Sequence, residues 1–314
     1  MSAYAVSPIL ARVAGALLLL LSLPALSEYP LEIQNVANNV YALVGELDQR
    51  SADNLGNNST HGMIVTDEGV ILIDSGGSYQ GARQIHDAIR SITDRPVTLL
   101  INSGGQDHRW FGNGYFKEQG AHILTSSAAL DDQRERAGQQ LARMENLIGD
   151  ALEGTQPVYA DEVFDSEERM QFGGVDLHIY HKGAAHTAGD SYIWLPEQKI
   201  MFSGDIVFVE RALGTGPARD VASWIRVFEE MAAFEPEVLV PGHGHATNLE
   251  TATRDTYDYL SFLYTEVSRM LEEGVELSDA VDLDQSQFEY LEVFDQISRK
   301  NAHNLYQQLE FDAF

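Results

Sequence analysis

The stretch that decides the fold of this chain runs from residue 97 to residue 108 and reads VTLLINSGGQDH. Its first part, Val97–Ile101, is an apolar run, which is typical of a β-strand covered on both faces. A glycine-rich loop follows the run and carries Gln106, Asp107 and His108. Polar side chains directly after a buried strand are typical of an active site in an α/β protein. This stretch therefore predicts an α/β fold with its chemistry at the strand ends.

Three further segments have the same plan, in which an apolar strand ends in a loop that carries histidine or aspartate. His186, Asp205 and His243 each follow such a strand. Taken singly, each side chain has a simpler explanation as a turn, a cap or a surface histidine. Together they predict a metal site, because imidazole and carboxylate groups are metal ligands. A ligand set without thiols suits zinc, with iron or manganese as alternatives.

Hydrophobic periodicity divides the rest of the chain into a mixed region and a helical tail. Strands are predicted at residues 40–44, 62–66, 70–74, 97–101, 175–180, 192–195, 199–202 and 238–240. Helices are predicted at residues 80–93, 130–152, 223–234, 251–273 and 285–309. We therefore expect an α/β core over residues 28–248 and a C-terminal helical extension, residues 249–314, packed on that core.

Residues 1–27 predict a cleaved secretory signal peptide. Arg12 precedes an apolar stretch from Val13 to Leu21, and small residues for cleavage lie within Pro24–Ser27. The apolar stretch is shorter than the roughly 20 residues of a spanning helix, which disfavours an uncleaved membrane anchor. We expect a periplasmic protein that has no stable association with the membrane after cleavage.

The composition excludes several classes of partner and chemistry. The chain has 20 lysines and arginines against 48 aspartates and glutamates, a formal net charge of −28. Such a charge repels nucleic acid and anionic lipid, which disfavours a nuclease and leaves a small molecule as the expected substrate. The chain has no cysteine, so disulfides, thiolate ligands and cysteine nucleophiles are excluded. The oligomeric state stays open.

In this order, the segments resemble the motifs of the metallo-β-lactamase superfamily. Asp74, within LIDSG, resembles a buried aspartate of that superfamily, and residues 102–108 resemble its His-x-His-x-Asp-His motif. His186, Asp205 and His243 resemble its third, fourth and fifth motifs. The resemblance implies an αββα sandwich, in which two mixed sheets lie face to face with helices outside. An aspartate at the fourth motif is similar to the hydroxyacylglutathione hydrolases.

The helical tail is similar to that of periplasmic members called quinoprotein relay system zinc metallohydrolases. The similarity rests on Asn301, Tyr306 and Leu309-Glu310.

One departure from the superfamily pattern concerns the first of its two metal sites. Gly104 and Gln106 stand where the superfamily has its first two histidines. The resemblance assigns these two positions and His186 to the first metal, so only His186 remains of that ligand set. A glycine offers no ligand, and a neutral amide is a poor zinc ligand beside imidazole.

The second metal site is complete in the sequence. The resemblance assigns it Asp107, His108, Asp205 as the bridging ligand, and His243. We therefore expect one zinc ion, not two.

We therefore expect a mononuclear zinc hydrolase that cleaves an ester, thioester, lactone or lactam. One zinc ion can polarise a carbonyl and lower the pKa of bound water to about 7. The expected catalytic residues are Asp107, His186 as a group that orients or deprotonates water, and Gln106 as a donor to the oxyanion. A non-catalytic periplasmic binding or accessory protein on a partly degenerate fold is the alternative, and redox use of iron is a third hypothesis.

Several residues near the motifs are weaker candidates. Arg109, Trp110 and the loop 214–219 are expected to line the rim of the pocket, with surface or packing roles as the alternative. His61 and His245 are candidates for contacts behind the metal ligands. Asp190 is expected to be a turn residue.

Overall fold

The computed structural model describes residues 30–216 and 220–312. The predicted signal peptide and Arg219 lie outside the described residues. Within the part of the chain that is described, no helix is both long and apolar enough to cross a membrane.

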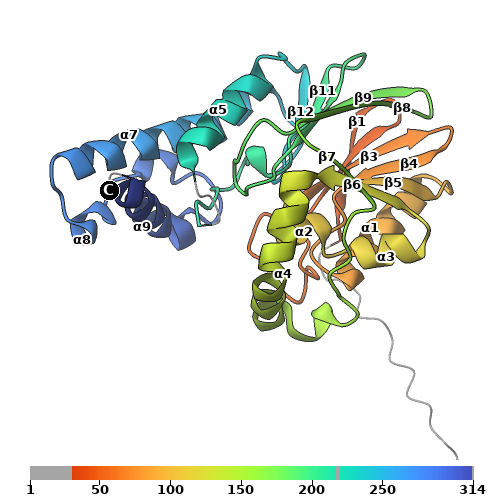
Figure 1. The fold of residues 1–314 in the computed structure, drawn as a ribbon, viewed down its shortest axis with the longest axis horizontal. Coiled ribbons are helices and arrows are strands. Elements are labelled where there is room, and N and C mark those ends of the chain that lie inside the picture. Colours follow the sequence, from red (N-terminus) through yellow and green to blue (C-terminus); the bar gives the residue numbers. More distant parts are fainter. Residues whose placement is uncertain (1–29, 217–219, 313–314) are drawn as a thin grey trace, which may run out of the picture.

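The first sheet has seven strands arranged in chain order (Figure 1). They are β1 (Glu32–Ala37), β2 (Val40–Val44), β3 (Thr60–Thr66), β4 (Gly69–Ile73), β5 (Val97–Asn102), β6 (His122–Ser126) and β7 (Glu162–Phe164). Strands β1 to β4 form an antiparallel meander, and β4 to β7 pair in parallel. The parallel half needs crossover connections, and helices provide them.

The second sheet has five strands in the order β12-β11-β10-β9-β8. They are β8 (Glu167–Phe172), β9 (Val175–Tyr180), β10 (Tyr192–Leu195), β11 (Ile200–Phe202) and β12 (Val238–Val240). Only β11 and β12 pair in parallel among these strands. Apolar side chains from the two sheets meet in one buried cluster that contains Ile73, Ile101, Ile179 and Phe202.

Helices cover the outer faces of the two sheets. Four helices connect the parallel strands of the first sheet: α1 (Tyr79–Ile92), α2 (Asp107–Trp110), α3 (Asn113–Glu118) and α4 (Ser127–Ile148). The second sheet is covered by α5 (Val221–Ala232). Ile85 and Ile89 of α1 are fully buried in a cluster with Leu72 of β4. The predicted fold class, an αββα sandwich with C-terminal helices, is confirmed.

The tail consists of helices that pack beside α5 at one end of the sandwich (Figure 1). They are α6 (Leu249–Ala252), a π-helical turn (Thr253–Tyr257), α7 (Asp258–Glu272), α8 (Leu277–Ala280) and α9 (Phe294–Asp312). Leu260 and Leu263 of α7 lie in the same buried cluster as Trp224 and Val227 of α5. The apolar stripe of α7 therefore covers the core of the same chain.

The sequence-based assignment missed β1, β6, β7 and β8, and it began the last helix too early. The pattern of β8 alternates between exposed and half-buried residues, and β1 has no fully buried residue. Such strands at a sheet edge lack the apolar run that identifies a central strand. Residues 285–293, predicted as helix, instead form a 3₁₀ turn (Ser286–Phe288) and an irregular segment before α9. Within that segment Val293 has a positive φ of 57°, which ends any continuous helix there.

Candidate metal centre

The ends of three strands bring three potential metal ligands together. His108 lies in α2 after β5, Asp205 follows β11, and His243 follows β12. One ligand atom from each of these side chains lies within 4.8 Å of the other two, and all three residues are buried. Among the described residues, no other group of three or more histidine, aspartate or glutamate side chains meets this condition. Two imidazoles and a carboxylate are a ligand set that fits zinc or a similar divalent ion.

Both histidines point their Nε2 atoms at Asp205. Nε2 of His108 lies 3.0 Å from Asp205 Oδ2, and Nε2 of His243 lies 3.2 Å from Asp205 Oδ1. Nδ1 of His243 lies 2.7 Å from the carbonyl oxygen of Asn58. Because that carbonyl can only accept, Nδ1 carries the proton and the Nε2 lone pair faces Asp205. A backbone carbonyl that fixes the tautomer in this way is typical of a metal-binding histidine.

A buried arginine holds Asp205 from behind. Arg109 Nη2 donates to Asp205 Oδ1 at 2.5 Å, and Arg109 Nη1 donates to Asp74 Oδ2 at 2.9 Å. Asp74 also accepts from the backbone N–H and the hydroxyl of Ser103, at 2.7 and 2.8 Å. Burial alone would raise the pKa of Asp205, but the adjacent guanidinium of Arg109 holds that pKa well below its usual value. Asp205 is therefore anionic, as a metal ligand must be.

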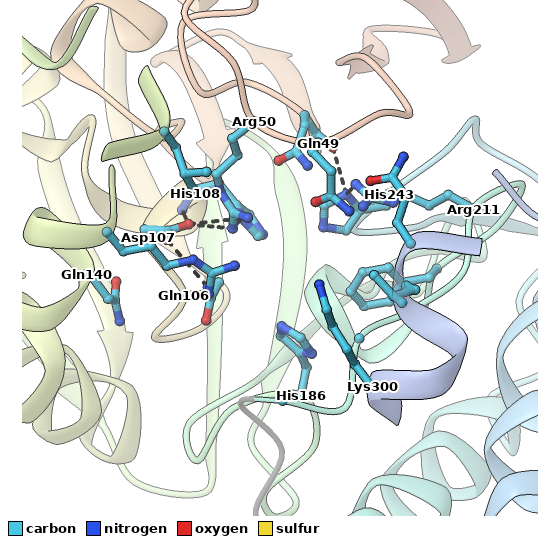
Figure 2. Close-up of a pocket in the computed structure, with 18 of the residues that line it drawn as sticks. Gln49, Arg50, Gln106, Asp107, His108, Gln140, His186, Arg211, His243 and Lys300 are labelled. Carbon is cyan, nitrogen blue, oxygen red and sulfur yellow. Dashed lines mark hydrogen bonds and ion pairs between the residues drawn. The ribbon is translucent and has the colours of Figure 1, made fainter. Parts of the chain in front are cut away.

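The fourth predicted ligand, Asp107, faces a cation from the loop after β2. Asp107 Oδ1 lies 2.5 Å from Arg50 Nη2, and the same nitrogen contacts His108 Nδ1 (Figure 2). Burial raises the pKa of Asp107, but the charge of Arg50 overrides this and lowers the pKa overall. The structure thus does not include Asp107 in the cluster of three, and its ligation stays a prediction.

At Gly104, in the region of the superfamily's first metal, a neighbouring carboxylate occupies the space that a side chain would need. A Cβ on Gly104 would lie 2.3 Å from Asp190 Oδ1. Asp190 is held as expected of a turn residue, since it accepts from the N–H and hydroxyl of Thr187 at 2.6 and 2.5 Å. The amide of Gln106 lies between Asp107 Oδ2 and Arg136 Nη1, at 3.4 and 3.3 Å.

His186 lies on the wall of the same cavity, outside the cluster of three (Figure 2). Its ring packs against Phe208 and Trp224, with centroids 5.4 Å from each. Its Nδ1 is buried and has no hydrogen-bond partner. Burial lowers the pKa of His186 to about 4, so the ring is neutral near pH 7.

His108, His186 and His243 line a cavity of about 710 Å³. Five cations that were not predicted from the sequence line this cavity: Arg50, Arg136, Arg143, Arg211 and Lys300. Two of them lie on one face of α4, at a spacing of seven residues that also includes Gln139 and Gln140. A basic and amide-rich helix stripe in so acidic a chain is a signal that could have indicated this face.

Some of the weaker candidates lie elsewhere: the rim role expected of Arg109 was wrong, and for Trp110 the alternative of a packing role holds. Arg109 and Trp110 do not line the rim, because both are fully buried, and Trp110 donates from Nε1 to Gln140 Oε1 at 3.2 Å. His245 contacts Glu210 and Glu32 at the surface.

The remaining weak candidates lie close to the site. Gly214 and Gly216 line the cavity, as expected of their loop. His61 is fully buried in β3, with Nε2 at 3.4 Å from Ser59 Oγ.

Comparison with known proteins identifies the family. Residues 56–243 match the metallo-β-lactamase superfamily, and this span is more than half of the chain. The chain belongs to the metallo-β-lactamase superfamily, whose members include hydrolases, and the resemblance of its motifs is confirmed.

Relatives in that superfamily include a β-lactamase and an alkylsulfatase. The chain is 25% identical to a metallo-beta-lactamase type 2 of Elizabethkingia meningoseptica over 206 residues, covering 63% of this chain and 73% of the relative. It is 21% identical to a linear primary-alkylsulfatase of a Pseudomonas species over 272 residues, covering 70% of this chain and 48% of the relative. The chain thus spans about half the length of that alkylsulfatase.

Solved structures show the same fold. A metallo-beta-lactamase from Pontibacter korlensis superposes with a TM-score of 0.60 at 22% identity, over 74% of this chain and 99% of that structure. A sec-alkylsulfatase from a Pseudomonas species superposes with a TM-score of 0.69 at 17% identity, over 88% of this chain and 50% of that structure. The second superposition covers 88% of the chain, which is more than the α/β core of residues 30–248 contains. The fold similarity therefore extends into the helical tail.

Proposed function

We propose that this protein is a metal-dependent hydrolase that holds one divalent ion at His108, Asp205 and His243, and that this ion is zinc. The proposal includes export to the periplasm, for which the sequence of residues 1–27 is the support. The observation that carries the proposal is the convergence of two imidazoles and one anionic carboxylate at a large cavity.

The donor set defines what a bound ion would do. A divalent ion held by these residues supplies Lewis acidity for the scissile group and lowers the pKa of water. Asp107 is the fourth candidate ligand, provided that Arg50 leaves its carboxylate. With Gly104 and Gln106 in place of two histidines, a second ion would lack ligands.

His186 is the best-placed residue to orient the attacking water. Its ring lines the cavity, and its Nδ1 is buried with no hydrogen-bond partner among the described residues. A ring whose pKa is lowered to about 4 is a weak base near pH 7, which favours orientation of water over removal of its proton. Gln106 has a second N–H that can donate to a developing oxyanion, since one N–H faces Asp107.

A hydrolysis screen on the zinc-loaded protein tests the proposal. The screen contains an ester, a thioester, a lactone and a lactam. It also contains an alkyl sulfate, because one relative is an alkylsulfatase. We expect turnover of at least one reporter, lost after chelation and restored by zinc. The matched control is His245→Ala, since His245 lies at the surface and its loss should leave turnover unchanged. Turnover that survives complete chelation would contradict the proposal.

A binding or accessory protein is the second candidate function. Two observations favour it: Arg50 contacts both Asp107 and His108, and Asp190 fills the space beside Gly104. Bound zinc without turnover of any reporter would favour this candidate.

A further inference from the structure

The cavity combines a positive lining with a strongly negative chain. Five of the chain's 20 lysines and arginines line it, whereas its lining includes a single carboxylate, that of Asp107. The positive residues come from four different segments, and Figure 2 labels Arg50, Arg211 and Lys300 among the residues that line the cavity. Charges of one sign that converge on one cavity repel each other unless an anion lies among them.

Arg211 is the most informative of these cations, because it is buried without an anionic partner. Its exposed fraction is 5%, and it makes no ion pair with a carboxylate in the described part of the chain. Arg211 Nη1 donates to the carbonyl oxygen of Asp48 at 3.2 Å, and its Nε is buried with no partner. A buried charge without a counter-ion is costly, and a ligand that supplies one offsets the cost.

The mouth of the cavity offers two more free cations on opposite walls. Arg143 of α4 and Lys300 of α9 line the cavity and make no hydrogen bond or ion pair with any described residue. Leu147 and Ile297 lie on the same two helices, and they provide apolar contact next to the cations. Arg136 is different, because its guanidinium is already paired with Asp132.

We infer that the cavity selects a substrate with a small apolar part and an oxyanion group, a carboxylate or a sulfate-type group, which is attracted by the positive lining that Arg211, Arg143 and Lys300 form. The inference rests on the proposed function, because it names the substrate class of that same site. Guanidinium groups bind both kinds of oxyanion through paired hydrogen bonds. The ester-type bond that is cleaved lies in the same molecule, toward His108 and His243.

Equilibrium binding by calorimetry, with ligands that the protein cannot hydrolyse, tests the inference. The probes are hexanesulfonate, hexanoate and the neutral hexanamide, which share one alkyl length. We expect saturable binding at one site per chain for at least one of the two anions, and binding at least about tenfold weaker for hexanamide. The preferred anion then shows which kind of oxyanion the cavity takes. Equal affinity for the amide and both anions would overturn the inference.

Matched variants locate the anion within the cavity. Arg211→Gln and the double variant Arg143→Gln/Lys300→Gln should each weaken binding of the preferred anion about tenfold or more. Arg90→Gln removes the same charge from the exposed face of α1 and should leave the affinity unchanged. Zinc content is measured in each variant, because Arg211 lies 3.4 Å from His243 Nδ1. Affinity unchanged in both cavity variants, or lost on chelation alone, would place the anion at the metal and overturn the inference.

The two proposals fail separately. Anion binding without turnover of any reporter contradicts the hydrolase only. Turnover of neutral esters, with a KM that does not change in the double variant, contradicts the anion site only.

Discussion

His186 and His243 differ in what surrounds them, although both are histidines at strand ends. His243 faces Asp205 through Nε2, whereas His186 has an unpartnered Nδ1 and lies between two aromatic rings. His186→Ala should therefore keep its zinc and lose turnover by about 10²–10⁴, the range of a positioned proton-transfer or water-orienting group. His243→Ala should lose its zinc. Elemental analysis and single-turnover rates of both variants are the measurement, and equal loss of zinc would make His186 a ligand.

Arg50 competes with a metal ion for two of the predicted ligands. Its guanidinium contacts Asp107 and His108, where a divalent cation would meet a like charge. Arg50→Gln should therefore bind zinc at least about tenfold more tightly, measured by competition with a fluorescent chelator. Arg90→Gln, which removes a distant charge, should have the affinity of the unaltered protein. Weaker zinc binding in Arg50→Gln would show that Arg50 supports the metal site.

The side-chain amide of Asn301 is one of the contacts that join the helical tail to the loop at the rim of the cavity. Asn301 of α9 donates to the Leu213 carbonyl at 2.7 Å and to the Tyr259 hydroxyl at 3.0 Å, and it accepts from the Thr215 N–H at 2.9 Å. The side chain thus bonds two backbone groups of the rim loop, the Leu213 carbonyl and the Thr215 N–H.

Asn301→Ala should lower the free energy of unfolding by about 1–3 kcal/mol, the cost of leaving such groups unsatisfied. Urea unfolding followed by circular dichroism measures this change. Gln307→Ala, an exposed position on the same helix, is the control and should stay within about 0.5 kcal/mol of the unaltered protein. A loss of similar size in both variants would mean that α9 itself, and not the contact with the loop, is affected.

The elements that the sequence predicts well are those with a buried run or a strong apolar stripe. Strands β3, β4, β5 and β12 and helix α1 are of this kind, and each lies within two residues of its predicted range. Edge strands such as β8 were missed, because polar residues on both faces hide their periodicity.

Within the candidate site, the strand-end residues were predictable, and the cations Arg50 and Arg211 were not. His108, Asp205 and His243 follow recognisable strands, so their convergence follows from topology. Arg50 and Arg211 lie in irregular loops, and their approach to the site depends on contacts between distant parts of the chain. No local pattern in the sequence indicates such an approach.

At the scale of the whole molecule, the charge distribution gives salt two opposite effects. The chain has a net charge of −28, so its carboxylates repel one another across the surface, and added salt screens that repulsion. Raising sodium chloride from about 20 mM to about 500 mM should therefore raise the Tm by at least about 2 °C. The same change should weaken hexanesulfonate binding, because salt also screens the cations of the cavity. Calorimetric scans and titrations across this range measure both effects, and a Tm that falls with salt would contradict this account of the charge.

The number of metal ions bound per chain distinguishes one zinc site from two. Two imidazoles and Asp205 form one ligand cluster, while Gly104 and Gln106 leave a second ion without its ligands. Elemental analysis of the mature protein, equilibrated with zinc and then freed of unbound metal, should give one ion per unaltered chain and none for His243→Ala. Two tightly held ions per unaltered chain would contradict the account.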